Sequence, residues 1–567
     1  MDDIAFIGIA PLPHEDTPFL QSTTSDDAIV PGGPPALLSP EAIGLFVQFG
    51  AVGFLVVLIP ALNYPLFNVY LQMEGYQTAS YAVLVQLGWS FKVVFGVLSD
   101  CVPLFGYRRK SWMLLGWFVA TLGLAAMACK PFGAPYCDRA NTSYCRMPRS
   151  QLPASELPYF NFHAPDQGTL FILLSMLVCM GYVVAECAAD ALMIAYGQRE
   201  PLATRGRLQT TALACRYAAS IPASLVSVFG LNGVQYNGSF TFSLAPNTPY
   251  AISLVPCVAA ACATVCLVAE RPSSSSSSSL STWWAAVWTV LQQQVFWQIC
   301  AFKFTNSFLR QVGATPLNPI KTFWANVEPA TDSLSSMAAN ALFSLSLVYV
   351  CRHGLQWNWR TALVVVNLAI VVLDATAIVA TTWAILRNQW FFAALTSAEQ
   401  IPNGLNMIVG SLCAVELATV GTEGTIYGLL ASMVNLGTPL ASALFKVVDA
   451  RVDVSQDAIK ADTETVRWHV TLVFVFAYTC KLVALVPLVL WLPPQKAHVQ
   501  ALKRDGIQSP IAGAVVLAVC GISLVFSLVS NVLSVLPATK CFRLAGGSGI
   551  VGSDGWCPVV PSSSTRL

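Results

Sequence analysis

The sequence predicts an all-α polytopic membrane protein with two six-helix bundles and a thirteenth, C-terminal transmembrane helix. Three observations predict this class. Of the 567 residues, 55% are hydrophobic and only 10% are charged, whereas a soluble globular protein carries roughly 25% charged residues. Apolar stretches of about 20 residues, long enough to cross a bilayer as a helix, recur along the whole chain. A polar, serine-rich segment separates six of these stretches from seven others.

Thirteen apolar stretches are predicted to span the membrane. The seventh is the most polar, because Lys303, Asn306 and Arg310 interrupt it and two prolines follow it. In chain order the predicted spans are residues 43–62, 79–98, 112–128, 169–196, 211–231, 250–269, 295–312, 333–350, 361–386, 390–415, 425–447, 470–491 and 511–536.

The domain organisation is expected to follow these spans. Seven consecutive serines, residues 273–279, form a polar tract that is expected to stay flexible and to bury nothing. The first 42 residues hold seven acids and no Lys or Arg, which fits neither a secretory signal nor a transit peptide. The expected parts are an acidic cytoplasmic tail (1–42), an N-terminal six-helix bundle (43–269), a Ser-rich cytoplasmic linker (270–291), a C-terminal six-helix bundle (292–492), a cytoplasmic loop (493–510), the extra span (511–536) and an extracytoplasmic tail (537–567).

Basic residues orient the chain in the membrane. Cytoplasmic loops carry an excess of Lys and Arg, and here the basic clusters follow the even-numbered spans. We therefore expect even-numbered spans to end inside and the N-terminus to lie inside. The clusters are Arg108, Arg109 and Lys110; Arg199, Arg205 and Arg207; Arg352 and Arg360; and Lys496, Lys503 and Arg504.

The glycosylation sequons agree with this orientation. Both of them, at Asn141 and Asn237, follow odd-numbered spans and so fall in predicted outside loops. Cys129, Cys137 and Cys145 share the first of these loops, where an oxidising compartment permits a disulfide. Free thiols remain the alternative, and Cys541 and Cys557 of the C-terminal tail form another possible pair.

Four ionisable residues lie deep in predicted spans of the first half. Lys92 lies about 12 Å from the inner end of its span, and Arg216 lies at a similar depth. Glu186 and Asp190 are four residues apart and so share one helix face. Charges facing lipid are costly, so these groups are expected to face a wet cavity or one another. In one interpretation the cations attract an anionic substrate and an acid carries a proton; in the other the four form structural salt bridges.

The second half offers further candidates. Lys303, Asn306 and Arg310 belong to a polar, interrupted helix, which is a typical location of a transporter site. Both cations could instead extend to a membrane interface. Glu399 is a further cavity candidate, whereas a structural role is expected for Asp374 and Lys481.

A motif near the end of the second span indicates a family. Residues 96–100 read Gly-Val-Leu-Ser-Asp and residues 106–110 read Gly-Tyr-Arg-Arg-Lys. This pattern resembles the loop between helices two and three of the major facilitator superfamily, with three extra residues between its two parts. The longer spacing, with Trp89 and Lys92 upstream, resembles the folate–biopterin transporter family. Segments 189–209, 399–404 and 421–436 extend this resemblance over spans one to eleven.

The resemblance implies a major facilitator fold and secondary active transport of a folate or pterin by alternating access, with proton coupling as a hypothesis. Cations suit the anionic tail of folate, and carboxylates and aromatic rings suit the pterin. The substrate-site candidates are Lys92, Arg216, Glu186, Asp190, Trp89, Tyr182, Lys303, Asn306, Arg310 and Glu399, with Glu186 or Asp190 as the proton carrier.

The same resemblance assigns a cytoplasmic gate. Asp100 is expected beside the N-terminus of the eleventh span, where exposed N–H groups favour an anion. This contact would latch the two bundles together while the cavity opens outward. The other gate candidates are Arg108, Arg109, Arg205, Arg207 and Glu423, and topology alone is the alternative explanation for the arginines.

Other classes of function find less support. The chain lacks the common hydrolase, metalloprotease and phosphate-loop motifs, so we expect no enzyme, and no spaced metal ligands or cofactor motif occur. A net charge of +1 argues against a nucleic-acid partner. The expected partners are a small-molecule substrate and the bilayer, most simply for a monomer in the plasma membrane. The alternatives are transport of another small organic anion, amino acid or nucleoside, and a non-transporting receptor.

Overall fold

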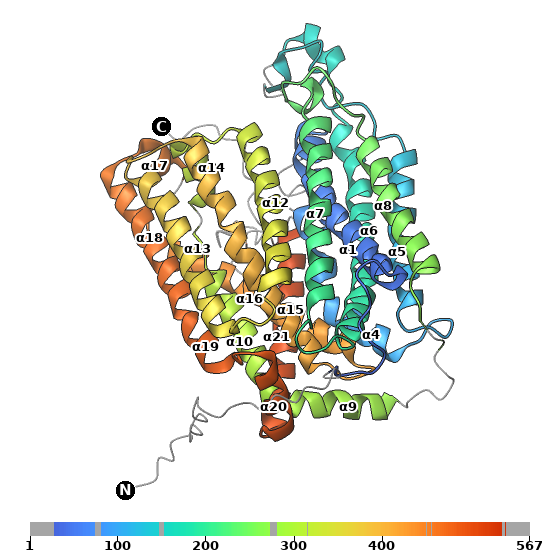
Figure 1. The fold of residues 1–567 in the computed structure, drawn as a ribbon. Helices are drawn as coiled ribbons and strands as arrows, with labels where there is room; N and C mark the ends of the chain where they lie inside the picture. The colour runs from blue at the N-terminus through green and yellow to red at the C-terminus, as the bar shows by residue number, and fades with distance from the viewer. Residues whose placement is uncertain are drawn as a thin grey trace.

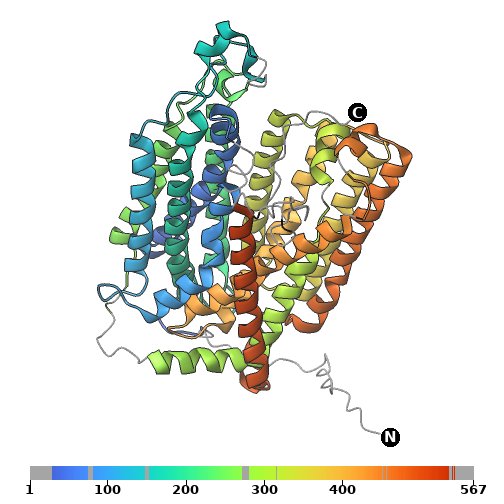
Figure 2. The same cartoon turned by 180° about the vertical axis from the view of Figure 1, so that it is seen from behind.

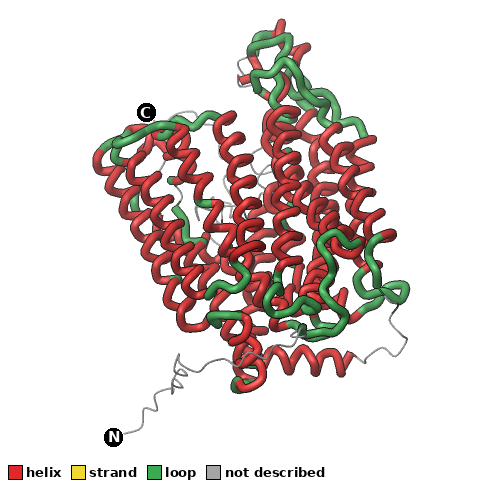
Figure 3. Tube along the Cα trace, in the orientation of Figure 1, coloured by secondary structure: helices red, strands yellow, loops and turns green. Residues whose placement is uncertain are grey.

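The computed structural model describes residues 28–73, 81–146, 152–270, 272, 280–314, 316–449, 451–454, 456–535, 539 and 542. Within these ranges every extended regular element is a helix, drawn in red in Figure 3. Ten of the helices in the described part of the chain are long and apolar enough to cross a membrane, by length and composition. The prediction of an all-α, multi-pass membrane protein is thereby confirmed, and the total of thirteen spans stays a prediction.

The first six predicted spans lie in helices of the N-terminal half. The first begins at Pro40, because the Ser39 hydroxyl accepts a hydrogen bond from the Ala42 N–H and proline suits a first helical turn. The third and fourth spans approach each other closely at Gly116, where an added Cβ would lie 2.5 Å from the Gly181 carbonyl oxygen. The helices are α1 (Pro40–Ala61), continued by η1 (Asn63–Tyr70), α3 (Leu87–Ser90), α4 (Lys92–Cys101), α5 (Lys110–Cys129), α6 (Ala164–Gly197), α7 (Arg207–Gly230) and α8 (Thr248–Cys266).

The next six predicted spans lie in helices of the C-terminal half. These are α10 (Gln294–Arg310), α12 (Pro329–His353), α13 (Trp359–Thr382), α14 (Gln389–Ala398), α15 (Gln400–Leu417), α16 (Glu423–Asp449), α18 (Glu464–Val483) and α19 (Leu485–Trp491). Short helical turns in the loops are η2 (Tyr144–Arg146), η4 (Ala154–Tyr159), η5 (Val234–Tyr236), α11 (Leu317–Pro319), η6 (Ile320–Trp324) and α17 (Gln456–Ala461).

The two halves stand side by side (Figure 1). Helix α7 of the first half packs against α12 of the second, and α4 packs against α16. These two helix pairs place residues from both halves around a common central region, which contains the candidate site.

Two helices break close to that region. Helices α3 and α4 meet at Phe91, directly before Lys92, so the predicted span 79–98 is not one continuous helix. Helix α14 ends at Ala398 and α15 starts at Gln400, so Glu399 lies at the junction. Pro402 accounts for the second break, because a proline ring clashes with the carbonyl four residues earlier, that of Ala398. Broken helices at this depth are common where a membrane transporter binds its substrate.

Two segments that were expected to be a cytoplasmic linker and a cytoplasmic loop contain helices. The expected linker (270–291) contains most of α9 (Leu280–Gln292), and the expected loop (493–510) contains α20 (Lys496–Asp505). In Figure 1 both lie at the lower end of the long helices. The serine run therefore covers only part of the linker, because the residues after it, with three tryptophans, favour an interfacial helix. The expected tail (1–42) likewise overlaps α1.

The last long helix, α21 (Pro510–Val535), corresponds to the predicted thirteenth span. It packs against α9, α10 and α16 and also touches α3 of the other half. Figure 2 shows it in red, running between the two halves. The C-terminal helix is therefore part of the membrane domain rather than a detached anchor.

The first predicted outside loop contains a disulfide between Cys137 and Cys145, whose Cα atoms are 5.6 Å apart. Cys129 of the same loop is free, so the expected disulfide is confirmed and its partners are identified. Asn141 and Asn237 are both exposed. The expected pair Cys541 and Cys557 lies outside the described residues.

Candidate functional site

A cavity of about 650 Å³ lies between the two halves. Its volume falls within the range of small-molecule pockets. The N-terminal half contributes Trp89, Lys92, Arg216 and Tyr217, and the C-terminal half contributes most of the remaining wall. The cavity is therefore shared by both bundles, as alternating access requires.

The four charged residues of the N-terminal half form one cluster. Lys92 Nζ lies 2.7 Å from Asp190 Oδ2 and 3.4 Å from Glu186 Oε1. Arg216 Nη1 also contacts Glu186 Oε1. Two cations thus face two carboxylates, and the cluster is neutral in total. This arrangement corresponds to the structural salt bridges, one of the two interpretations that the sequence allowed. Lys92 and Arg216 nevertheless also line the cavity.

The two aromatic candidates, Trp89 and Tyr182, differ in their access to the cavity. The Trp89 ring lies 5.1 Å from Lys92 Nζ and 5.2 Å from Arg216 Cζ, and it lines the cavity. The ring of Tyr427, which belongs to the C-terminal half, also lies 5.1 Å from Lys92 Nζ. Tyr182 is buried behind Trp89, with 6.3 Å between the ring centroids, and is not among the lining residues. Trp89 and Tyr427 can therefore touch a ligand directly, whereas Tyr182 supports Trp89.

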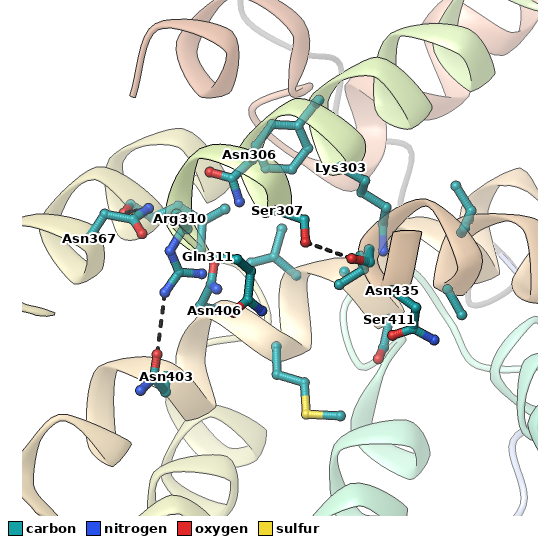
Figure 4. A pocket seen from close by; sticks show the side chains of 18 of the residues that line it. Lys303, Asn306, Ser307, Arg310, Gln311, Asn367, Asn403, Asn406, Ser411 and Asn435 are labelled. Atoms are coloured by element: carbon teal, nitrogen blue, oxygen red, sulfur yellow. Dashed lines mark hydrogen bonds between the residues drawn. The ribbon is translucent and has the colours of Figure 1, made fainter. Parts of the chain in front are cut away.

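The C-terminal half holds two cations without an acidic partner. Within the described part of the chain, neither Lys303 nor Arg310 forms an ion pair with a carboxylate, and both line the cavity. Arg310 Nη2 lies 3.3 Å from Asn403 Oδ1 (Figure 4). Lys303 extends past Gly410, where an added Cβ would lie 3.0 Å from Nζ. These two side chains give this side of the cavity an uncompensated positive charge.

Amide side chains surround the two cations. Asn306 is 8% exposed and its Oδ1 has no hydrogen-bond partner, so it retains an acceptor for a ligand. Sequence reasoning selected Asn306 but missed the other amides, although asparagine within an apolar span was a usable indication. The missed lining residues are Gln311, Asn367, Asn403, Asn406 and Asn435 (Figure 4).

Glu399 also lines the cavity. Its Oε1 is buried and has no hydrogen-bond partner. Nearby, Lys481 Nζ lies 2.8 Å from Asp374 Oδ2, joining α18 to α13. That ion pair agrees with the structural role expected for Asp374 and Lys481, although Lys481 also reaches the cavity wall.

Part of the expected gate forms one contact between the halves. Asp100 accepts hydrogen bonds from the Gly424 N–H at 3.2 Å and the Thr425 N–H at 2.6 Å, at the start of α16. Arg109 Nη2 lies 2.6 Å from Asp100 Oδ1 and 2.7 Å from Glu423 Oε2. A carboxylate at a helix N-terminus is stabilised by the unpaired N–H groups there.

A second buried contact joins the halves on the same side. Arg205 Nη1 lies 3.0 Å from Glu416 Oε2 at the end of α15, and both side chains are almost fully buried. Helix α20 covers this pair, because Gln500 Nε2 donates to Glu416 Oε2 and Lys496 Nζ donates to the Arg205 carbonyl oxygen. Burial lowers the pKa of Lys496 to about 8. Sequence reasoning missed Glu416 and α20, because neither stands in a recognisable motif.

The other two gate candidates differ: Arg108 reaches the opposite half, where an added Cβ at Gly421 would lie 3.3 Å from its Nη1, and Arg207 pairs within its own half. Arg207 is 3.8 Å from Glu200 Oε1 within its own half. The N–H groups of Arg108, Arg109 and Lys110 donate to the Glu270 carboxylate, which caps the start of α5. Glu270 was not selected as a candidate from the sequence, although it is an acidic residue directly after the last apolar stretch of the N-terminal half.

Comparisons with known proteins find partial sequence matches. Residues 55–137 match the BT1 family. The chain is 39% identical over 64 residues to Folate transporter 1 of Plasmodium falciparum (isolate 3D7), covering 10% of this chain and 13% of that protein. It is 27% identical over 139 residues to a folate-biopterin transporter of Synechocystis sp., covering 24% of this chain and 21% of that protein. The matched segments thus span only a small part of either relative.

Solved structures match over most of the chain. The proton:xylose symporter XylE bound to 6-bromo-6-deoxy-D-glucose superposes with a TM-score of 0.53 at 10% identity, covering 82% of this chain and 98% of that chain. A D-xylose-proton symporter superposes with a TM-score of 0.52 at 12% identity, covering 80% and 98%. The protein therefore has the major facilitator fold. Residues 55–137 match the BT1 family, and the partial sequence relatives confirm the resemblance to folate–biopterin transporters. These relatives are transporters, not enzymes.

Proposed function

We propose that this protein is a secondary transporter that moves a folate- or pterin-type substrate across the membrane by alternating access. The observation that carries the proposal is the cavity between the halves, in which Lys303 and Arg310 form no ion pair with any carboxylate of the described residues. The names of the partial sequence relatives supply the substrate class.

The cation pair suits the acidic end of such a substrate. A buried charge without a counter-ion is costly, so an anion that enters the cavity relieves an existing penalty. Arginine binds carboxylates in a two-pronged geometry, whereas the Asn306 Oδ1 is an acceptor for an N–H or O–H group elsewhere on the ligand. Lys92 and Arg216, which the sequence suggested for this role, already have carboxylate partners. The substrate anion is therefore assigned to the C-terminal half.

The flat ring system suits the opposite wall. Trp89 and Tyr427 present aromatic faces to the cavity beside Lys92. Aromatic rings stack on planar heterocycles, and the amides of the C-terminal half can donate to and accept from ring nitrogen and oxygen atoms. A ligand with a planar head and an acidic tail would thus contact both halves at once.

The contacts at Asp100 and Arg205 supply the cytoplasmic gate of this proposal. Both join the two halves on the side of the basic loops. In the proposed cycle they hold the cytoplasmic side closed while the substrate enters from outside, and they separate when the cavity opens inward. The exposed sequon asparagines and the Cys137–Cys145 disulfide support passage through the secretory route, so we assign the protein to the plasma membrane.

The function is tested by uptake of labelled folate and biopterin into proteoliposomes that contain the purified protein. Saturable uptake, absent from empty vesicles, is the expected result. Failure to take up or bind either compound would contradict the assigned substrate class. Uptake of another organic anion instead would identify the alternative carrier. Binding of folate or biopterin without uptake would identify a receptor.

A further inference from the structure

We propose that Glu399 is the proton-binding residue of this transporter and that it couples proton entry to substrate binding by competing with the substrate anion for the cavity cations. This inference rests on the proposed transport function and assigns its coupling site. Sequence reasoning assigned the proton to Glu186 or Asp190 instead.

The position of Glu399 gives it access to the cavity without a fixed partner. It lies at the junction of α14 and α15, where Pro402 interrupts the helix. Its side chain lines the cavity, its Oε1 is buried, and Oε1 accepts no hydrogen bond. Among the described residues no Lys or Arg forms an ion pair with Glu399. A carboxylate in this position can gain or lose a proton without breaking an existing salt bridge.

The two acids of the N-terminal half differ in this respect. Glu186 contacts both Lys92 and Arg216, and Asp190 lies 2.7 Å from Lys92. A proton on either acid would leave a nearly buried cation short of counter-charge, which is strongly unfavourable. Their pairing favours a permanently charged cluster that orients Lys92 and Arg216.

Charged groups reach Glu399 from three neighbouring helices. Asp374 of α13 and Lys481 of α18 lie close enough to interact with it electrostatically. Tyr478 of α18 carries a buried hydroxyl without a hydrogen-bond partner nearby. Arg310 of α10 reaches the same helix face through Asn403, one turn after Glu399. Asp374 and Lys481 are thus the charged groups that interact with Glu399, and Arg310 approaches the same helix one turn further on.

This arrangement links the proton to the substrate. Ionised Glu399 places a negative charge in the cavity that Lys303 and Arg310 also line, and so weakens the attraction of the cavity for a substrate carboxylate. A proton taken from the outside water converts the Glu399 carboxylate to a neutral acid and so restores the attraction of the cavity for the substrate carboxylate. Substrate binding in turn favours protonated Glu399, because the coupling between two sites is reciprocal. The proton and the anion therefore enter together, and both leave when the cavity opens inward.

The test compares wild type with Glu399→Gln, which mimics the neutral acid. In proteoliposomes, wild-type folate uptake should increase about tenfold, within the usual span of coupling energies, when the outside buffer is acidic rather than neutral. Glu399→Gln should lose this stimulation yet still exchange labelled folate for unlabelled folate across the membrane. Glu464→Gln makes the same substitution at an exposed position at the start of α18, and it should behave like wild type.

A binding measurement keeps the test decisive if the variant cannot transport. Adding folate to weakly buffered, detergent-solubilised protein should withdraw protons from solution for wild type and not for Glu399→Gln. Undiminished proton stimulation or proton uptake in Glu399→Gln would overturn the proposal. Loss of proton stimulation and of proton uptake in Asp190→Asn but not in Glu399→Gln would overturn it as well. Wild-type transport without any pH effect would reject the coupling but preserve the proposed function, whereas an absence of wild-type binding would reject the function itself.

Discussion

At the scale of single residues, the roles of the charged side chains depend on which of them are paired. Lys92 and Lys303 are both lysines in predicted spans; the sequence left a substrate role or a salt bridge open for Lys92, and a cavity role or extension to the membrane interface for Lys303. The structure separates them, because Lys92 lies within 4 Å of two carboxylates, whereas Lys303 faces the cavity and forms no such pair in the described part of the chain. An unpaired cation is the group that a ligand can neutralise.

Replacing Lys303 therefore tests the assignment of the anion site. Lys303→Gln should weaken folate binding by roughly 10- to 100-fold, since a hydrogen bond to a charged group contributes about 1.5–3 kcal/mol. Binding of a pterin without an acidic tail should change little. Equilibrium binding of both ligands to detergent-solubilised protein provides the measurement.

Lys321→Gln is the matched control, because Lys321 pairs with Asp332 away from the cavity. An equal loss for folate and for the tail-less pterin would show that Lys303 maintains the structure of the cavity rather than binding the acidic group.

The sequence predicted which residue types carry the chemistry better than it predicted their partners. The resemblance gave Asp100 five candidate gate partners, and the structure brings two of them, Arg109 and Glu423, together with Asp100 in one contact. Glu416 was missed, because its partner Arg205 is 211 positions away in the chain. Local periodicity carries no information about such a pair, which depends on how the halves pack.

At the scale of secondary-structure elements, the least expected feature is helix α20 on the cytoplasmic side. Its Lys496 side chain is 4% exposed and donates to the Arg205 carbonyl oxygen. Its Lys503 donates to the Glu416 and Leu417 carbonyl oxygens at the end of α15. One short helix thus contacts both sides of the Arg205–Glu416 ion pair. This segment was expected to be a loop, because it lies between two predicted spans and contains no apolar stretch long enough to cross the membrane.

The burial of Lys496 predicts a pH dependence of stability. Its folded-state pKa of about 8 lies below the ordinary value of 10.5. Between these values the unfolded chain binds more protons, so this residue makes the protein more stable as the pH rises from about 8 to 10.5. Relative to Lys496→Met, the free energy of unfolding of wild type should rise by about 1–3 kcal/mol over this range and should be flat below it.

Thermal unfolding of both proteins in detergent, recorded at several pH values, gives this difference directly. Other lysines titrate equally in the two proteins and cancel from the comparison. A difference that does not vary with pH would mean that Lys496 is hydrated in the folded state.

At the scale of the whole molecule, composition and periodicity predicted the class well. Each of the thirteen apolar stretches overlaps a helix, because a chain in lipid must satisfy its backbone hydrogen bonds internally. Positions where helices break, and the path of α21 between the halves, could not be predicted, since they follow from packing between distant segments. The central claim for the whole molecule is a single aqueous chamber that opens to the two sides in turn.

Accessibility of one cavity residue tests that claim most directly. Ser411 lines the cavity and is 6% exposed, and Ser411→Cys changes little in size. In sealed proteoliposomes, a membrane-impermeant thiol reagent should label Ser411→Cys beyond the unsubstituted protein from the outside, and folate should protect it. With Asp100→Asn added, which weakens the cytoplasmic gate, labelling from the inside should increase. If Ser411→Cys reacts from neither side, or if folate gives no protection, the halves enclose no such chamber and the account is contradicted.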